Sequence, residues 1–263
     1  MSNITIHRQK SDTKPIDSIT ISESGTHVEI IADDGVHCSV SLILEAPNCT
    51  ISVTAKKNSE LTVNLLQTSN GTISQKSQAE EGASVRFVNI TLAEVCEHDL
   101  ESHLIGANAK SDVDWMFYAT GQEKHTLSAR NVFDAQKGGG QITMKGVAEG
   151  ESEVKCDGLI DISDNGKGTD TYLTEDILML DKTARVDAIP GLEIKTNDVK
   201  ASHSATVSKV TPEDLFYFAS RGIDEKAARH MYVRGFLGEL TSQIEDSSIA
   251  ELVHEAIERK YVI

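Results

Sequence analysis

Apolar residues in positions 1–209 alternate with polar ones or gather in short β-branched runs, and no long helical period interrupts them. Such an alternation places every second side chain on the same face of an extended chain, so each run predicts a β-strand. Turn-forming residues, such as those at 70–71 and 165–166, separate the runs. The clearest predicted strands cover residues 50–54, 61–66, 84–88, 112–118, 141–147 and 192–195.

The spacing of the later strands favours a β-solenoid over a sandwich or a barrel. Segments that begin at residues 168, 184 and 199 share small and polar residues and recur about every fifteen positions. Stacked β-coils impose this kind of period on a sequence. The repeat alone does not determine the handedness of the coils.

The chain beyond the last predicted strand is expected to be helical. Thr211 is a natural N-cap and Pro212 suits the first helical position. Asp214 suits the third position, where free amides and the positive end of the helix dipole favour a carboxylate. Asp224 is expected to cap a second helix, and a third is predicted near residues 248–259.

Two glycines, Gly235 and Gly238, lie inside the second predicted helix. Each costs about 1 kcal/mol compared with alanine in a helix interior. Their presence therefore predicts close packing of this helix against a neighbour. Because three short helices cannot bury themselves fully, they are expected to dock on the β-core or on a partner.

Composition limits the classes of partner. With 263 residues, of which 39% are hydrophobic, the chain is long enough for one large domain or for one domain with an appendage. The 41 acidic residues outnumber the 25 basic ones, which gives a formal net charge of −16. Nucleic acids and anionic membranes attract cationic surfaces, so neither is expected as a partner.

Cysteine usage and the absence of targeting signals predict a protein of a reducing cytoplasm. No segment reaches the ~18 apolar residues of a spanning helix, and the first residues have no apolar signal core. The four cysteines, Cys38, Cys49, Cys96 and Cys156, are widely spaced and show no C-x-x-C pair. Neither a zinc knuckle nor a disulfide framework is therefore indicated.

A resemblance to a known family rests on the segment where strands give way to helices. Residues 190–207 follow the pattern P-x-LEI-x(3)-D-V-K-x-SH-x-ATV, and residues 215–236 continue with L-F-Y-x(3)-RGI-x(3)-A and V-x-G-F. This block closely resembles the C-terminal half of the SufB/SufD iron–sulfur cluster assembly scaffolds. Shorter matches to the family, in the same order, lie at residues 125–128, 158–160 and 170–172. The resemblance covers about residues 100–245 and has no counterpart of the family's long N-terminal extension, which suggests a short form.

The resemblance implies a right-handed parallel β-helix core over residues 1–209, clearest from about residue 100, and a C-terminal helical docking segment over residues 210–263. It implies a non-enzymatic scaffold that docks a SufC-like ABC-type ATPase through the C-terminal helices. The same scaffold is expected to pair through its β-helix with itself or with a SufB/SufD homologue. Its cargo would be a transient iron–sulfur cluster or iron, shared with a partner chain. A SufB-like and a SufD-like role both remain open.

Three residues are candidate iron or cluster positions. The family's SufD-type histidine falls on His203, and its SufB-type cysteine falls near Glu175. Glu193, in the preceding predicted strand, is the nearest further acidic candidate. Imidazole nitrogen and carboxylate oxygen both suit Fe(II). Apart from the resemblance, a histidine between two alanines is more often a hydrogen-bonded core residue than a ligand.

Sulfur ligands are scarce in this region. Ala201 stands where many SufD-like proteins have cysteine, and Cys156 is the only cysteine inside the resemblance. A cluster held by this chain alone would therefore lack thiolates. Either a partner chain supplies them or the protein is the structural half of a pair. A thiol and an imidazole at Cys96 and His98 could bind a metal, but a buried inert cysteine beside a surface histidine is favoured.

The residues expected to bind the ATPase lie in the first two predicted helices. Four of them form the exposed rim and two lie beneath it, namely Tyr217, Arg221, Arg229 and Arg234 at the rim and Phe236 and Leu237 below.

Two alternatives without an iron–sulfur role remain. A structural β-solenoid would use the helices only as a cap. A polysaccharide-active β-helix would need paired carboxylates and aromatic platforms, whereas aromatic residues make up 5% of this chain, with the single tryptophan Trp115.

Overall fold

The chain forms two facing parallel β-sheets followed by three helices. The computed structural model describes residues 2–9, 18–242, 244 and 246–262. Sheet A contains, in spatial order, β1 (Asn3–Arg8), β3 (Thr26–Ala32), β5 (Cys49–Ala55), β7 (Gly71–Ala79), β9 (Val95–Leu104), β11 (Lys124–Phe133), β13 (Glu153–Ile162) and β15 (Arg185–Ala188), and β16 (Gly191–Ile194) also pairs with β13. Sheet B contains β2 (Ile19–Ile21), β4 (His37–Leu44), β6 (Glu60–Gln67), β8 (Ser84–Thr91), β10 (Lys110–Ala119), β12 (Gly139–Ala148), β14 (Thr169–Met179) and β17 (Val199–Lys209).

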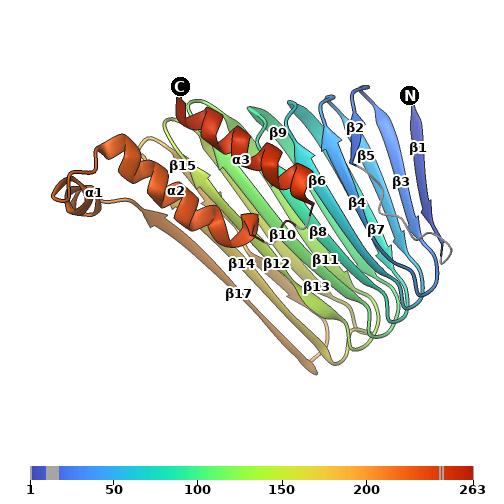
Figure 1. Cartoon of the computed structure of the whole chain (residues 1–263). Helices are drawn as coiled ribbons and strands as arrows, with labels where there is room; N and C mark the ends of the chain where they lie inside the picture. Colours follow the sequence, from blue (N-terminus) through green and yellow to red (C-terminus); the bar gives the residue numbers. More distant parts are fainter. Residues whose placement is uncertain (1, 10–17, 243, 245, 263) are drawn as a thin grey trace.

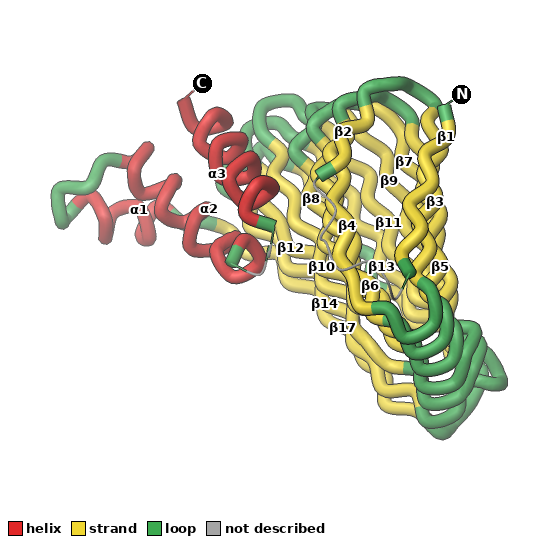
Figure 2. Tube along the Cα trace, turned by 45° about the vertical axis from the view of Figure 1, so that its right-hand side comes forward, coloured by secondary structure: helices red, strands yellow, loops and turns green. Residues whose placement is uncertain are grey.

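Successive strands alternate between the two sheets, so two strands make one coil of a parallel β-helix (Figures 1 and 2). The predicted β-helix core with C-terminal helices is confirmed. A coil advances by 23 residues near the N-terminus, from His37 to its partner Glu60, and by 30 near the C-terminus, from Thr169 to Val199. The fifteen-residue spacing seen in the sequence is therefore half a coil, because each half contributes one strand to a different sheet.

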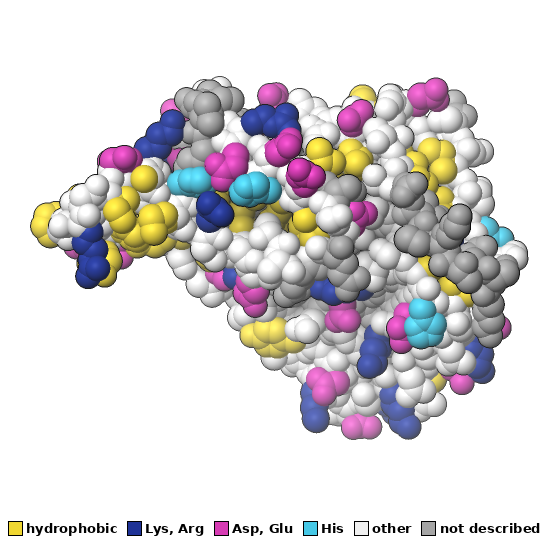
Figure 3. Space-filling view, viewed as in Figure 1, with side chains coloured by type: hydrophobic (Ala, Val, Ile, Leu, Met, Phe, Trp, Pro, Cys, Tyr) yellow, Lys and Arg dark blue, Asp and Glu magenta, His cyan; other side chains and the backbone are white. Residues whose placement is uncertain are grey.

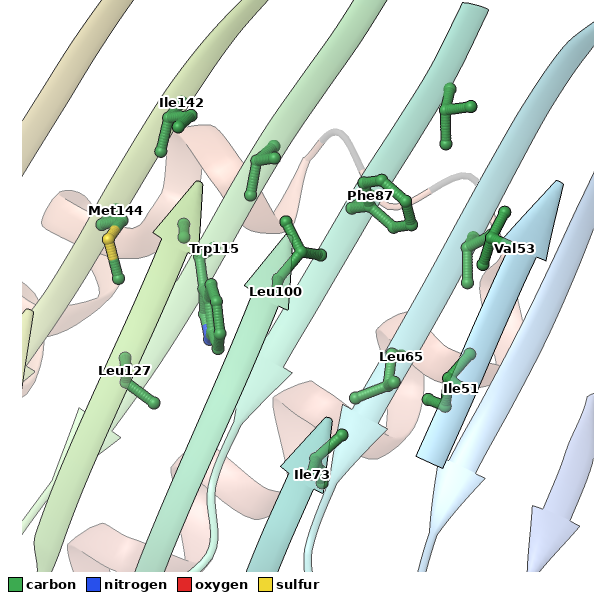
Figure 4. Close-up of a cluster of buried hydrophobic side chains, with 14 of the residues drawn as sticks. Ile51, Val53, Leu65, Ile73, Phe87, Leu100, Trp115, Leu127, Ile142 and Met144 are labelled. Atoms are coloured by element: carbon green, nitrogen blue, oxygen red, sulfur yellow. The ribbon is translucent and has the colours of Figure 1, made fainter. Parts of the chain in front are cut away.

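The core fills the space between the sheets. Inward positions alternate with outward ones along each strand, as in β5, where every second residue is buried. Phe87 and Trp115 from sheet B meet Leu100 and Leu127 from sheet A in the middle of this core (Figure 4). Large aromatic side chains bury roughly 150–250 Å² each, so these layers supply much of the hydrophobic stabilisation of the solenoid.

A second apolar cluster lies on the outer face of sheet B. Outward residues of this sheet, including Ile90, Met116 and Leu178, pack against α2 (Glu225–Thr241) and α3 (Ser247–Val262). From α2 and α3, the buried side chains of this cluster are Val233, Leu237, Leu240, Ile249, Val253 and Ile257. The helices thus cover part of the outer face of sheet B, which explains why strands such as β8 and β10 end in continuous buried runs after an alternating start.

The helix starts follow the sequence signals. Thr211 caps α1 (Pro212–Ala219) in a reciprocal capping box with Asp214, and the side chain of Asp224 accepts from the amide of Ala227 at the start of α2. The packing predicted at Gly235 and Gly238 is wrong: apart from adjacent residues and the backbone of α2 itself, a Cβ built at either position would have no described atom within 4 Å.

Candidate functional site

The C-terminal end of the β-helix is open. β17 forms the last strand of sheet B and pairs only with β14, so its other edge is unpaired among the described residues. His203 lies on this strand in register with Leu173, a core residue. Because residues in register on parallel strands point to the same side, His203 faces the interior of the solenoid. Its side chain is nevertheless exposed, since no further coil of the described chain follows it.

Glu175 lies one strand further in, on β14, and points into the core from the same side. Its register partner on β17 is Ala205, two residues from His203. The structure therefore brings His203 and Glu175 to the same interior face at the open end. One carboxylate oxygen of Glu175, Oε1, accepts a hydrogen bond from the Gly158 amide at 2.8 Å. The other oxygen, Oε2, is buried without a hydrogen-bond partner among the described residues.

The geometry around Glu175 explains its electrostatics. Burial raises the pKa of this carboxyl group to about 7, although the nearby amides of Gly158 and Ile189 oppose the shift. Only glycine permits the approach at position 158, because a Cβ there would lie 2.9 Å from Oε1 and 2.6 Å from a methyl of Leu173. Gly158 itself faces a break in sheet A, where β15 ends and β16 begins.

Glu193 is not part of this group. It pairs in register with Asp161 on β13, whose neighbours Ile160 and Ile162 fill the core. Strand alternation therefore turns Asp161 and Glu193 to the outer face of sheet A, whereas His203 faces inward. Ion pairs with two cations hold Asp161 on that outer face, namely those with Arg130 and Lys195.

Cys156 is a residue to which the sequence analysis assigned no role. It lies on β13, fully buried, and shares the inward face with Gly158. Burial, and then the negative charge of Glu175, raise the pKa of the Cys156 thiol above its ordinary value. The signal that could have found this pair is the alternation in β14, where the charged Glu175 takes an inward position between Leu173 and Ile177.

Among the residues that the structure describes, no three histidine, cysteine, aspartate or glutamate side chains converge on a point where they could hold a metal ion. The open end thus presents dispersed imidazole, carboxyl and thiol donors rather than a complete metal centre. Imidazole, carboxyl and thiol groups are donor types that bind iron in proteins.

The first helix, α1, has no buried residue and projects from the body of the molecule (Figure 1). Its exposed side includes Phe216 and Tyr217, which are 72% and 53% exposed. Hydrophobic side chains are visible on this projection in the space-filling view (Figure 3). The guanidinium carbon of Arg221 lies 4.6 Å from the centre of the Tyr217 ring. An exposed aromatic pair beside a cation is a typical protein-binding feature.

The residues predicted on α2 divide into anchors and exposed positions. Arg234 is exposed, Leu237 is buried against sheet B, and Phe236 is half-buried with the Lys145 ammonium 4.9 Å from its ring centre. The predicted place of Arg229 at an exposed rim is wrong. Its side chain is only 16% exposed, and its guanidinium binds two carboxylates, Glu149 at 2.9 Å and Asp181 at 2.7 Å. Arg229 therefore fixes α2 to the turns of the β-helix.

None of the helices in the described part of the chain has the length and apolar content needed to cross a lipid bilayer.

Comparison with known proteins agrees with this architecture. The family model described as "SUF system FeS cluster assembly, SufBD core domain" matches residues 17–236. An iron–sulfur cluster assembly SufBD family protein of Mycobacterium tuberculosis is 27% identical over 224 residues, which cover 85% of this chain and 26% of the relative. The iron–sulfur cluster assembly protein SufD of Escherichia coli is 30% identical over 161 residues, which cover 60% of this chain and 38% of the relative. The matched segment thus spans between about a quarter and two fifths of these relatives, and the match to the family model shows that the chain belongs to the SufBD core family of the SUF iron–sulfur cluster assembly system.

Proposed function

We propose that the chain is a non-ATPase scaffold subunit of a SUF-type iron–sulfur cluster assembly complex. The observation that carries this proposal, beyond family membership, is the uncovered C-terminal end of the β-helix, where β17 leaves a long free edge and His203 is exposed on the inner face. Solenoid ends are normally capped, and free strand edges are normally covered. Here α2 and α3 pack on the outer face of sheet B instead of covering this edge.

The open end supports pairing with a second β-helix, either another copy or a SufB/SufD homologue. An unpaired edge offers a row of amide and carbonyl groups to a strand of the partner. Apolar side chains accompany it, since Ile189, Ile194 and Val207 are each more than 40% exposed. Pairing would also let the partner complete the ligand set around His203.

Light scattering tests this pairing directly. Val207→Asp adds a charge to the inner face of β17 and is expected to weaken self-association or pairing with a homologue at least tenfold, with little change in melting temperature. Val95→Asp is the matched control, because Val95 is also exposed, at 51%, but lies on β9. A monomeric wild-type chain, alone and with a SufB/SufD homologue, would rule out pairing.

The projecting α1 supports docking of an ABC-type ATPase. Phe216, Tyr217 and Arg221 form an exposed aromatic and cationic surface, in which the Tyr217 ring also meets Phe218 edge-on. Deleting all residues after Val210 would be a poor test, because it would uncover the apolar outer face of sheet B. Substitutions on α1 avoid this problem, since none of its residues is buried.

The docking test is a pull-down with a SUF-type ATPase. Phe216→Ser and Tyr217→Ser are expected to reduce binding at least tenfold, with the fold unchanged. Ile105→Ser removes an apolar side chain that is 46% exposed outside the helices and should have no effect. Equal binding by the α1 variants and the wild type would show that the ATPase does not dock on α1.

A polysaccharide-active role gains no support from the aromatic residues. The single tryptophan, Trp115, is fully buried and donates to Thr91 at 3.0 Å, so it offers no platform for a sugar ring.

A further inference from the structure

Two buried acidic groups enter the interior of the last complete coil from opposite sheets. Cys156 enters the core from β13 in sheet A, and Glu175 enters it from β14 in sheet B. Glu175 Oε1 lies 2.8 Å from the amide of Gly158, two residues from Cys156 on the same inward face. The carboxylate is therefore close enough for its charge to act on the thiol.

A hydrogen bond to the backbone satisfies only one of the two carboxylate oxygens of Glu175. The break between β15 and β16 leaves the Gly158 amide without a strand partner, and Oε1 accepts from it. The nearby Ile189 amide donates instead to the carbonyl of Cys156, at 3.0 Å. Oε2 is buried and accepts no hydrogen bond within the described part of the chain. A buried carboxylate oxygen without a partner is costly and calls for a ligand such as water, a proton or a cation.

Only small side chains of the outermost coil lie in register with Cys156 and Glu175. In the outermost coil, the register partner of Cys156 is Ala188 and that of Glu175 is Ala205. Ala205 is exposed and Ala188 is half-buried, so a single layer of small side chains separates the pair from the open end. The exposed His203 lies two residues from Ala205 on the same strand.

We propose that Cys156 Sγ and Glu175 Oε2 form a two-ligand half-site for a divalent transition-metal cation. A thiolate and a carboxylate together carry two negative charges, which one such cation neutralises in a low-dielectric interior. Binding replaces the thiol proton and any proton on the carboxyl group, and both protons pass to solvent. Water or a ligand from a paired chain completes the coordination shell. The identification of this cation with Fe(II) cargo rests on the proposed function, whereas the half-site itself does not.

Anaerobic titration with Co²⁺ alone tests the half-site on the whole chain, because a Co²⁺–thiolate bond has a charge-transfer absorption that oxygen and nitrogen ligands lack. Wild type is expected to develop this band at one equivalent. Cys156→Ser should abolish it, and Glu175→Gln should weaken binding at least tenfold. Cys49→Ser is the matched control, since Cys49 is also buried but only burial raises its pKa.

A second measurement covers the case in which Cys156→Ser does not fold. Zn²⁺ should slow alkylation of Cys156 in the wild type at least tenfold, read by peptide mass spectrometry, and should leave Cys49 unaffected. Absence of the thiolate band in the wild type, or its survival in Cys156→Ser, would overturn the half-site. Pairing and ATPase docking are measured without metal, so their failure or success is separate from this result.

Discussion

Acid should destabilise the β-helix through His98, a residue expected at the surface but fully buried in the structure. Its Nε2 lies 3.2 Å from Gln75 Oε1, and its ring meets that of Trp115 edge-on with centroids 4.5 Å apart. Burial lowers the pKa of His98 from 6.5 to about 3. The native state therefore binds this proton less tightly than the unfolded chain does, so protonation favours unfolding.

The size of the effect follows from the shift. The contribution of His98 to the free energy of unfolding is intact above pH 6.5 and falls by about 1.4 kcal/mol per pH unit as the pH drops toward 3. Between pH 6.5 and pH 4.5 the loss is about 3 kcal/mol. His125 adds a similar slope down to pH 4, because burial also lowers its pKa, to about 4.

The variant His98→Leu isolates this contribution. Leucine has a similar volume, so the variant should be only about 1–2 kcal/mol less stable than wild type at pH 7.5, mainly from the lost hydrogen bond and ring contact. It cannot be protonated, so its stability should fall less steeply on acidification, and the two curves should converge near pH 5. The slope that remains in the variant includes that of His125.

Urea unfolding at several pH values gives the required free energies. Fluorescence is a suitable probe, because Trp115 is the only tryptophan and touches His98. His254→Gln, which changes an exposed histidine on α3, should give a curve parallel to that of the wild type. If His98→Leu and the wild type also ran parallel from pH 7.5 to pH 4.5, the reasoning about burial would be refuted.

Three further outcomes are expected. His203→Ala should sharply reduce the iron and sulfide retained after anaerobic reconstitution with a pairing partner, while the melting temperature stays nearly constant because the side chain is exposed. Glu193→Gln is the matched control and should retain the wild-type amount, because Glu193 lies on the outer face of sheet A. Unchanged cluster content in His203→Ala would exclude His203 as a ligand. Arg229→Met should lower the free energy of unfolding by about 2–3 kcal/mol, mainly through loss of the ion pairs with Glu149 and Asp181. The exposed Arg234→Met should lower it by less than about 0.5 kcal/mol, and equal losses would contradict the anchoring role. Gly235→Ala and Gly238→Ala should each stabilise α2 by about 1 kcal/mol in thermal unfolding, and a loss of stability would show that these positions do not have the free space seen here.

The fold could be predicted from the sequence because the strands and helices of a β-helix protein are each marked by short-range sequence patterns. Each strand carries its own period-two alternation, and each helix carries its own cap, as Thr211 and Asp224 show. The number of residues in one coil could not be predicted in the same way. Strands of the two sheets have the same local pattern, so a fifteen-residue spacing does not reveal that two such units complete one coil.

The features that sequence reasoning missed are those that depend on a partner far along the chain. Arg229 has the spacing of an exposed helical residue, but Glu149 and Asp181, 80 and 48 positions away, hold it against the β-helix. The sequence around His98 predicts a surface residue, but in the structure Gln75 of the preceding coil forms a hydrogen bond with its ring. In each case a residue far along the chain forms a hydrogen bond or ion pair with the buried polar side chain, although Nδ1 of His98 has no partner among the described residues. The local hydrophobic period does not reveal which distant residue this is.

The open end shows how such distant partners bear on function. Strand parity alone turns Cys156, Glu175 and His203 inward, and the coil register then places all three at one end of the solenoid. Several inward polar groups in the middle of the solenoid have partners there, such as Ser77 with Ser102 and Ser111 with Asn131. Others there, such as Gln75 Nε2 and Asn89 Oδ1, are buried without a partner among the described residues, as Glu175 Oε2 is. Glu175 differs from them in its position, because it lies one coil from the unpaired edge of β17. The proposed half-site depends on this position, because a group in the middle of the solenoid has coils on both sides, whereas a group in the last complete coil has only one short coil beyond it.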